Sequence, residues 1–125
     1  MSDLTDLTLT RAAEALRLGQ ASSRELTLAF LERIQRLEPH LHAFLTLTAD
    51  RALQQAEVAD RRLAEWRKDP AVSLSPVLGV PLAVKDVLCV AGVRCTCGSR
   101  ILEDFVPPFD ATAVARLLFA GMVVL

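Results

Sequence analysis

The fold of this chain is decided by the stretch VLGVPLAVKD, residues Val77 to Asp86. Its first eight residues are apolar, include three valines and carry no charge, a pattern typical of a strand buried on both faces of an α/β sheet. Pro81 is the exception, because proline cannot donate to a ladder and indicates that the sheet is entered or kinked there. The stretch therefore predicts a strand over residues 77–84 that ends at Lys85.

Two capped helices are predicted near the N-terminus. Thr8 or Thr10 can cap a short amphipathic helix that ends at Gly19. Ser22 and Glu25 then have the spacing of a capping box, in which each side chain bonds the backbone N–H of the other residue. The helix that they start is expected to stop at Pro39, and its apolar residues recur at helical spacing.

A third helix and a connector separate these helices from the decisive stretch. Residues 42–48 (HAFLTLT) alternate and predict an extended segment or a short strand. Residues 49–66 carry an apolar stripe with charges on the opposite face, which predicts an amphipathic helix. Residues 70–76 (PAVSLSP) have the composition of a loop.

The sequence after the stretch predicts one more helix and one more strand. Asp110 is the expected N-cap of a helix that begins near Thr112, with Gly121 beyond its end. Residues 122–125 (MVVL) are apolar and β-branched, as in the start of a buried strand. Residues 1–69 thus form a helical part, and residues 77–125 form the start of an α/β core.

Composition excludes several classes of protein. The chain has 125 residues, of which 52% are hydrophobic and 23% charged, with 14 Lys and Arg against 15 Asp and Glu. These values are those of a globular chain and not of a disordered or collagen-like one. The near-neutral balance also argues against a nucleic-acid-binding module that works through a basic surface. No apolar run approaches the roughly 20 residues of a membrane helix.

The N-terminus and the cysteines indicate a cytoplasmic protein. Residues 1–10 contain Asp3 and Asp6 and no basic residue, so we expect no secretory leader. The three cysteines are too few, and odd in number, for a disulfide framework, and they fit a reducing compartment.

Lys85 is the residue most suited to carry chemistry. A lysine at the carboxyl end of a central strand stands where open α/β sheets form their ligand crevices, and desolvation there would favour the neutral form that can act as a base. The alternative is a surface lysine paired with Asp86. Lys68, the only other lysine, follows an amphipathic helix among charged residues and is expected to be solvated.

A metal site is not expected. Cys95 and Cys97 resemble half of a zinc site, but tetrahedral zinc needs four ligands at suitable spacing. The remaining candidates are Cys89 and, far upstream, His40 and His42. Buried thiols and surface histidines explain these residues more simply.

Several segments resemble the amidase signature family. They are GVPLAVKD at 79–86, Ala91-Gly92-Val93, and Thr96-Cys97-Gly98-Ser99. Within the family, residues 100–103 and VPPFDAT at 106–112, with Ser22 to Leu26 and Ala43-Phe44-Leu45, resemble the A subunits of aspartyl/glutamyl-tRNA amidotransferases. The resemblance covers essentially the whole chain. It implies an α/β fold with N-terminal helices followed by the first strands and a helix of the family's mixed sheet, truncated at residue 125, so that residues 1–125 form the N-terminal part of a single domain.

The resemblance also implies a mechanism. The family hydrolyses amides with a serine nucleophile, a second serine in a cis peptide, and a lysine that acts as base through that bridging serine. Lys85 stands at the position of the base. Both catalytic serines of the family lie in Gly- and Ser-rich segments after the strand that begins at Met122, so neither is expected in this chain, and Ser99 matches neither. The isolated chain is therefore expected to be inactive.

Partners and cofactors follow from the same resemblance. In this branch of the family glutamine is hydrolysed, and the ammonia passes to a partner that amidates misacylated Glu-tRNA(Gln) or Asp-tRNA(Asn). The implied partners are the B and C subunits of the complex. ATP and Mg would be used by one of those partners, with no cofactor or metal held by this chain. The sequence accordingly contains no phosphate loop. Two alternatives stay open: a general amidase of the same family, or a non-catalytic helical module that docks a partner.

Overall fold

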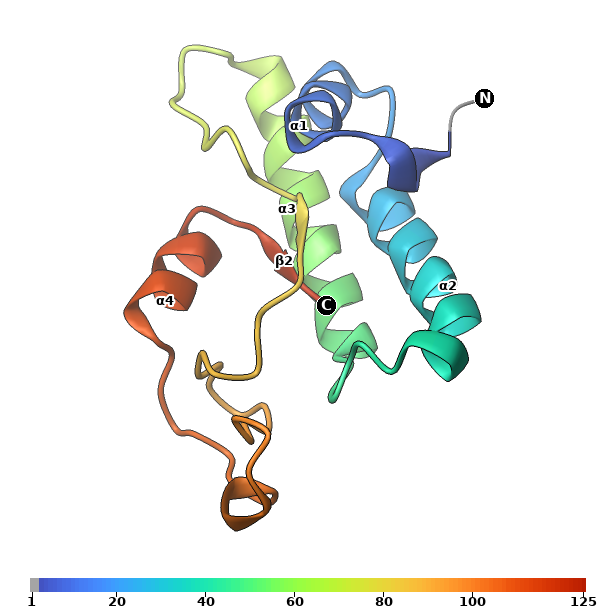
Figure 1. The fold of residues 1–125 in the computed structure, drawn as a ribbon. Coiled ribbons are helices and arrows are strands. Elements are labelled where there is room, and N and C mark those ends of the chain that lie inside the picture. The colour runs from blue at the N-terminus through green and yellow to red at the C-terminus, as the bar shows by residue number, and fades with distance from the viewer. Residues whose placement is uncertain (1–2) are drawn as a thin grey trace.

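The computed structural model describes residues 3–125 (Figure 1). Met1 and Ser2, which belong to the stretch expected to contain no leader, lie outside the described residues. The elements in chain order are η1 (Leu4–Asp6), α1 (Leu9–Leu18), α2 (Ser23–Leu41), α3 (Ala49–Lys68), β1 (Pro81–Leu82), η2 (Arg100–Leu102), α4 (Thr112–Phe119) and β2 (Val123–Val124). The predicted mixture of N-terminal helices and a first pair of strands is confirmed.

Helices α1 and α2 begin at their predicted capping residues, and α1 ends at its predicted glycine. The Thr8 side chain accepts a hydrogen bond from the Arg11 N–H at the start of α1, and Gly19 closes this helix with a φ of 69°. Both bonds of the capping box between Ser22 and Glu25 are present. Hydrogen bonds from the backbone N–H and the hydroxyl of Ser22 hold the pKa of the Glu25 carboxyl below its ordinary value.

Pro39 does not stop α2, contrary to prediction. The helix continues to Leu41 and ends at His42, whose φ is 48° and whose N–H bonds the Glu38 carbonyl at 2.9 Å. Proline removes only its own N–H from the helical ladder, and here it does so in the last turn. The left-handed conformation of His42 ends the helix instead.

The three N-terminal helices share an apolar core. Its buried residues come from α1, α2, α3, the approach to β1 and the residue before β2, and they are Ala12, Leu16, Leu26, Ala59, Leu63, Leu78, Val80 and Met122. A second cluster joins α3 to β2 through Ala52, Ala56, Val123 and Leu125. The α3 stripe therefore packs on the other helices at one end and supports the sheet at the other.

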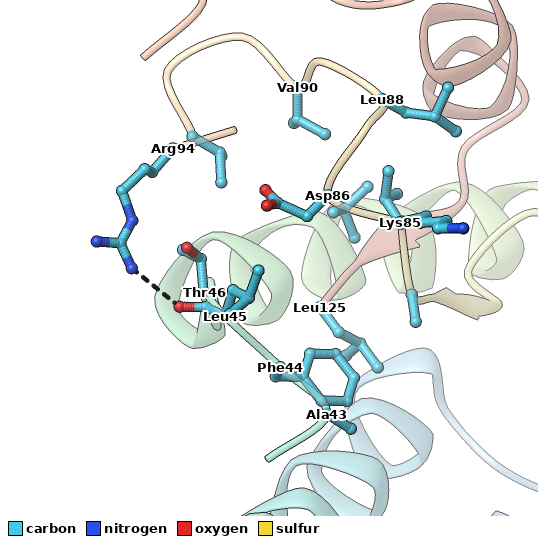
Figure 2. Close-up of a pocket in the computed structure, with 14 residues that line it drawn as sticks. Ala43, Phe44, Leu45, Thr46, Lys85, Asp86, Leu88, Val90, Arg94 and Leu125 are labelled. Carbon is cyan, nitrogen blue, oxygen red and sulfur yellow. Dashed lines mark hydrogen bonds between the residues drawn. The ribbon is translucent and has the colours of Figure 1, made fainter. Parts of the chain in front are cut away.

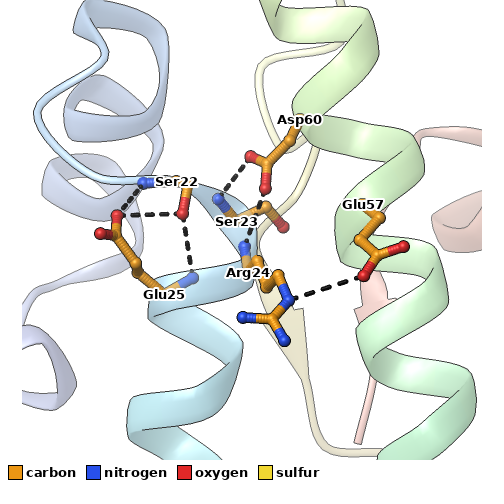
Figure 3. A network of polar contacts seen from close by, with 6 residues as sticks. All are labelled: Ser22, Ser23, Arg24, Glu25, Glu57 and Asp60. Atoms are coloured by element: carbon orange, nitrogen blue, oxygen red, sulfur yellow. Dashed lines mark hydrogen bonds and ion pairs between the residues drawn. The ribbon is translucent and has the colours of Figure 1, made fainter.

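A polar network joins α2 to α3 at the N-terminal end of α2 (Figure 3). The two carboxylate oxygens of Asp60 accept hydrogen bonds from the backbone N–H groups of Ser23, at 2.7 Å, and Arg24, at 3.1 Å. These N–H groups belong to the first turn of α2 and have no partner within the helix. The buried Ser23 hydroxyl donates to the Gly79 carbonyl at 2.6 Å, so the same helix end also fixes the approach to β1.

The predicted strand over residues 77–84 is much shorter in the structure. Residues 76–79 form a turn, in which the Val80 N–H bonds the Val77 carbonyl at 3.2 Å and Gly79 has a φ of 81°. The Gly79 N–H bonds the Gly121 carbonyl at 2.8 Å. The ladder is entered at Pro81, as its missing N–H indicates, and only Pro81 and Leu82 form β1.

The two strands form a parallel pair whose outer edge at β2 is covered by side chains of the α3 region. Pro81 pairs with Val123 and Leu82 with Val124. On the other side of β2, the Val124 N–H donates to Gln55 Oε1 at 2.9 Å, and the Val124 carbonyl accepts from the Thr48 hydroxyl at 3.2 Å. An edge strand leaves backbone N–H and C=O groups unpaired. Here the Gln55 and Thr48 side chains bond those groups of Val124 in place of another strand.

The connection between the strands is mostly irregular. Figure 1 shows it leaving the end of β1, running away from the helices and returning through α4 to β2. The predicted last helix is present, but Asp110 is not its N-cap: Ala111 takes that position without a side-chain bond. The Asp110 carboxylate instead accepts the Ala91 N–H at 2.7 Å and so holds two loop segments together. No helix within residues 3–125 is long and apolar enough to cross a lipid bilayer.

Candidate active site

Lys85 lies three residues after the end of β1, beside a pocket of about 430 Å³. Because β1 and β2 are parallel, their carboxyl ends lie at the same end of the sheet. Ligands of open α/β sheets bind at this end. The pocket is bounded by residues 43–46, which form an irregular segment with a bend at Leu45 and not the predicted short strand, by loop residues 83–94 and by the end of β2 (Figure 2). Phe44 and Leu125 form its apolar floor, and Val90 lies on the opposite side.

The Lys85 side chain is exposed, and its ammonium group makes no hydrogen bond or ion pair with any of residues 3–125. The desolvation that the sequence predicts at this position is therefore not supplied by the described part of the chain. The alternative pairing with Asp86 is not formed either. In Figure 2 the Lys85 ammonium and the Asp86 carboxylate point in opposite directions.

The Asp86 carboxylate is hydrogen-bonded to Thr96, ten residues later in the chain. It accepts the Thr96 N–H at 2.9 Å and the Thr96 hydroxyl in a short hydrogen bond. Burial raises the pKa of the Asp86 carboxyl, but the hydrogen bonds from the Thr96 hydroxyl and from backbone N–H groups outweigh it, and the pKa lies below its ordinary value. The group is therefore held in its charged form.

Two arginines fasten the loop to the helical part of the chain. The Arg94 guanidinium donates to the Leu45 carbonyl at 3.1 Å (Figure 2), and both residues line the pocket. The Arg51 guanidinium, from α3, donates to the Ala91 carbonyl at 2.9 Å. The sequence assigns no role to the Thr96 side chain or to either arginine, because nothing in the local pattern indicates which distant carbonyl or carboxylate a polar side chain reaches.

The cysteines form a compact group of free thiols. Cys95 is buried, and burial, with Cys89 and Cys97 nearby, raises the pKa of its thiol to about 11. Such a thiol is a poor nucleophile. Across residues 3–125, no three His, Cys, Asp or Glu side chains are arranged to hold a metal ion. His40 and His42 are exposed in and after the last turn of α2.

The serines near the fold's turns have structural partners. Ser22 belongs to the capping box, and Ser23 bonds the Gly79 carbonyl. Ser99 accepts the Ile101 N–H at 3.2 Å and is the N-cap of η2. The site thus places a lysine at a sheet edge beside a pocket, with a fixed carboxylate as its chain neighbour.

Curated proteins with similar sequences identify the relatives of this chain. The chain is 50% identical over 125 residues to the A subunit of the glutamyl-tRNA(Gln) amidotransferase of a Roseiflexus species, and 48% identical over 123 residues to that of Pelobacter propionicus. These alignments cover 100% and 98% of this chain and 24% of each relative. The chain therefore spans about a quarter of the length of the curated relatives that it matches.

Solved structures of amidases contain the same fold. The chain superposes on the X-ray structure of the peptide amidase from Stenotrophomonas maltophilia with a TM-score of 0.81, at 35% identity, over 96% of this chain and 24% of that one. The family model described as Amidase matches residues 25–125, which include Lys85 and Asp86. The resemblance drawn from residues 79–112 is thereby confirmed, and the chain belongs to the amidase family.

Proposed function

We propose that this chain supplies the lysine base of a glutamine-hydrolysing amidase site in the A subunit of a tRNA amidotransferase. The observation that carries the proposal is the position of Lys85, at the carboxyl edge of the β1–β2 pair and beside a pocket. The similarity of almost the whole of this chain to two amidotransferase A subunits supports the same assignment. It does not favour a general amidase or a helical docking module.

In the proposed reaction the neutral amine of Lys85 accepts a proton from a bridging serine, which takes the proton of the nucleophilic serine. The nucleophile attacks the side-chain amide carbon of glutamine, and the proton held by Lys85 returns through the bridging serine to the amide nitrogen, which leaves as ammonia. Water then hydrolyses the ester to glutamate. Both serines would lie outside residues 1–125. The Lys85 side chain has no partner among the described side chains of residues 3–125, so it is free to meet them.

The proposed setting is translation in the cytoplasm. The ammonia would pass within a complex with the B and C subunits and amidate misacylated Glu-tRNA(Gln) or Asp-tRNA(Asn). ATP and Mg²⁺ would be used by one of these partners, and this chain would hold neither.

The test is a chimera in which residues 1–125 replace the aligned segment of the Roseiflexus relative, purified with the other subunits of that complex. Lys85→Ala should lower the glutaminase rate by roughly 10²–10⁴-fold, the range of a lost general base. Lys68→Ala, the same change at an exposed lysine at the end of α3, should leave the rate within about twofold of the parent chimera, as expected for a surface substitution. A Lys85→Ala chimera that assembles and retains the parent rate would refute the proposal.

A further inference from the structure

The backbone around Lys85 is fixed on both sides although its side chain is free. On the N-terminal side, the Leu125 N–H bonds the Leu82 carbonyl at 3.0 Å, which anchors the end of β1 to β2. On the C-terminal side, the Lys85 carbonyl accepts the Leu88 N–H at 2.9 Å and closes a turn. Residues 83–85 themselves belong to no helix or strand, so the position of Lys85 depends on the anchors at either side.

Asp86 and Thr96 strengthen the anchor on the C-terminal side. Besides the two bonds to the Asp86 carboxylate, the Asp86 carbonyl accepts the Cys97 N–H at 3.0 Å and the Cys95 thiol at 3.3 Å. The Thr96 hydroxyl also accepts the Gly98 N–H at 3.1 Å. Thr96 is 9% exposed and Asp86 is partly buried, so water competes less for their hydrogen bonds than it does at the open surface.

The hydrogen bonds of Asp86 hold the backbone beside Lys85 in place and do not pair the two charges. Its carboxylate points away from the Lys85 ammonium (Figure 2), and no ion pair joins the two side chains. A carboxylate that only balanced the lysine charge would face it. Asp86 instead bonds a segment ten residues later, which clamps the backbone next to Lys85.

We infer that Asp86 and Thr96 are positioning residues for Lys85, in that their hydrogen bonds set the place from which the lysine side chain reaches the reacting groups. This inference rests on the proposed function, because only a catalytic lysine needs such placement. Misplacing a catalytic group by about 1 Å can lower a rate by about a hundredfold, so loss of this clamp should lower kcat while substrate binding is retained.

The test uses the same chimera and measures kcat and KM for glutamine separately. Asp86→Asn removes the charged acceptor, and Thr96→Val removes the hydroxyl at nearly constant shape. Each should lower kcat at least about tenfold with KM within about twofold, as expected for an interaction that acts on placement and not on substrate binding. Thr96→Ser restores the hydroxyl and should recover kcat to within about threefold of the parent.

The matched control is Asp110→Asn. Asp110 also accepts a backbone N–H, that of Ala91, and staples the same loop, but its bond does not involve the residues next to Lys85. It should keep kcat within about threefold of the parent, because its bond does not set the place of the lysine.

Three results would overturn the inference: Thr96→Val and Asp86→Asn with parental kcat, a Thr96→Ser variant as slow as Thr96→Val, or an Asp110→Asn loss as large as theirs. Lys85→Ala separates the two levels of the account. If Lys85→Ala is inactive while Asp86→Asn and Thr96→Val keep the parental kcat, only the positioning inference fails; if Lys85→Ala is active, the proposed function itself fails.

Discussion

Helices α1–α3 and the connection from residue 83 to residue 111 are held together by different forces. The helices share a core in which Leu16, Leu26 and Leu63 are each no more than 2% exposed. The connection has only the short η2 as regular structure, and its Ile101 side chain is 93% exposed. It is held in place largely by hydrogen bonds, some from side chains to the backbone and some between backbone groups, such as the bond from the Gly92 N–H to the Pro107 carbonyl.

This difference bears on function. Burial of apolar surface is non-directional and tolerates small shifts, whereas a hydrogen bond restricts its atoms to a narrow range of distance and angle. The proposed catalytic residue, Lys85, lies in the region held by hydrogen bonds. The helical part provides the stability on which the site depends, and the connection determines where the site's groups lie.

Leu63→Ala should have the largest effect on stability. Leu63 is 2% exposed in the helical core, so this truncation should lower the free energy of unfolding by about 2–5 kcal/mol. Leu88→Ala, the same change at a side chain 40% exposed in the connection, should cost under about 1 kcal/mol. Urea unfolding followed by circular dichroism measures both. Equal losses would contradict the difference between the two regions.

A pair of glycines gives a smaller effect. Gly79 and Gly92 both have a positive φ, at 81° and 75°, so alanine at either position should cost roughly 1–2 kcal/mol in backbone conformation. At Gly79 the added Cβ would also lie 3.0 Å from Ser23 and 3.2 Å from Ala59, while at Gly92 it meets nothing within 4 Å.

The free energy of unfolding of Gly79→Ala should therefore be lower than that of Gly92→Ala by about 1–3 kcal/mol, the usual cost of overpacking. The same urea titration measures this difference. If the two variants unfold at the same denaturant concentration, Gly79 is not closely packed against Ser23 of α2 and Ala59 of α3, and this part of the account is wrong.

Acidification should have the smallest effect, and the part of it that is due to Asp86 lies in the connection. Because the pKa of Asp86 is lowered in the folded chain, its hydrogen bonds contribute stability above the unfolded value of 3.8, and this contribution is lost as the pH falls through the folded value. Below pH 3.8 the Thr96 amide should exchange hydrogen faster relative to core amides of α3, after correction for intrinsic rates.

Asp86→Asn is the control for this measurement. It removes the titrating group, so the Thr96 amide should then show no pH-dependent loss of protection relative to α3. A loss of the same size in the variant would assign the effect to other carboxyl groups.

The elements that the sequence predicts correctly are those whose signals are local. Thr8 and the Ser22–Glu25 pair start their helices where expected, because a cap needs only residues within one turn. The predicted end of α2 is wrong, since the conformation of His42, and not Pro39, decides it. The lysine after β1 is predicted because the apolar run and the family resemblance both point to it.

The features that the sequence does not predict depend on contacts between distant residues. The turn at 76–79 is fixed by the bond from Gly79 to Gly121 and by Ser23, which lies 56 residues earlier. Asp110 has the sequence of an N-cap, yet it bonds Ala91. In each case a local pattern fits two structures, and a partner far along the chain selects one.

The most direct test of the account is Lys85→Arg in the chimera with the Roseiflexus relative, with glutaminase rate as the readout. Arginine keeps the positive charge and a long side chain but does not give up its proton in proteins. The account predicts a rate loss as large as that of Lys85→Ala, roughly 10²–10⁴-fold. A Lys85→Arg complex with the parental rate would show that charge alone suffices and would contradict the role of Lys85 as the base.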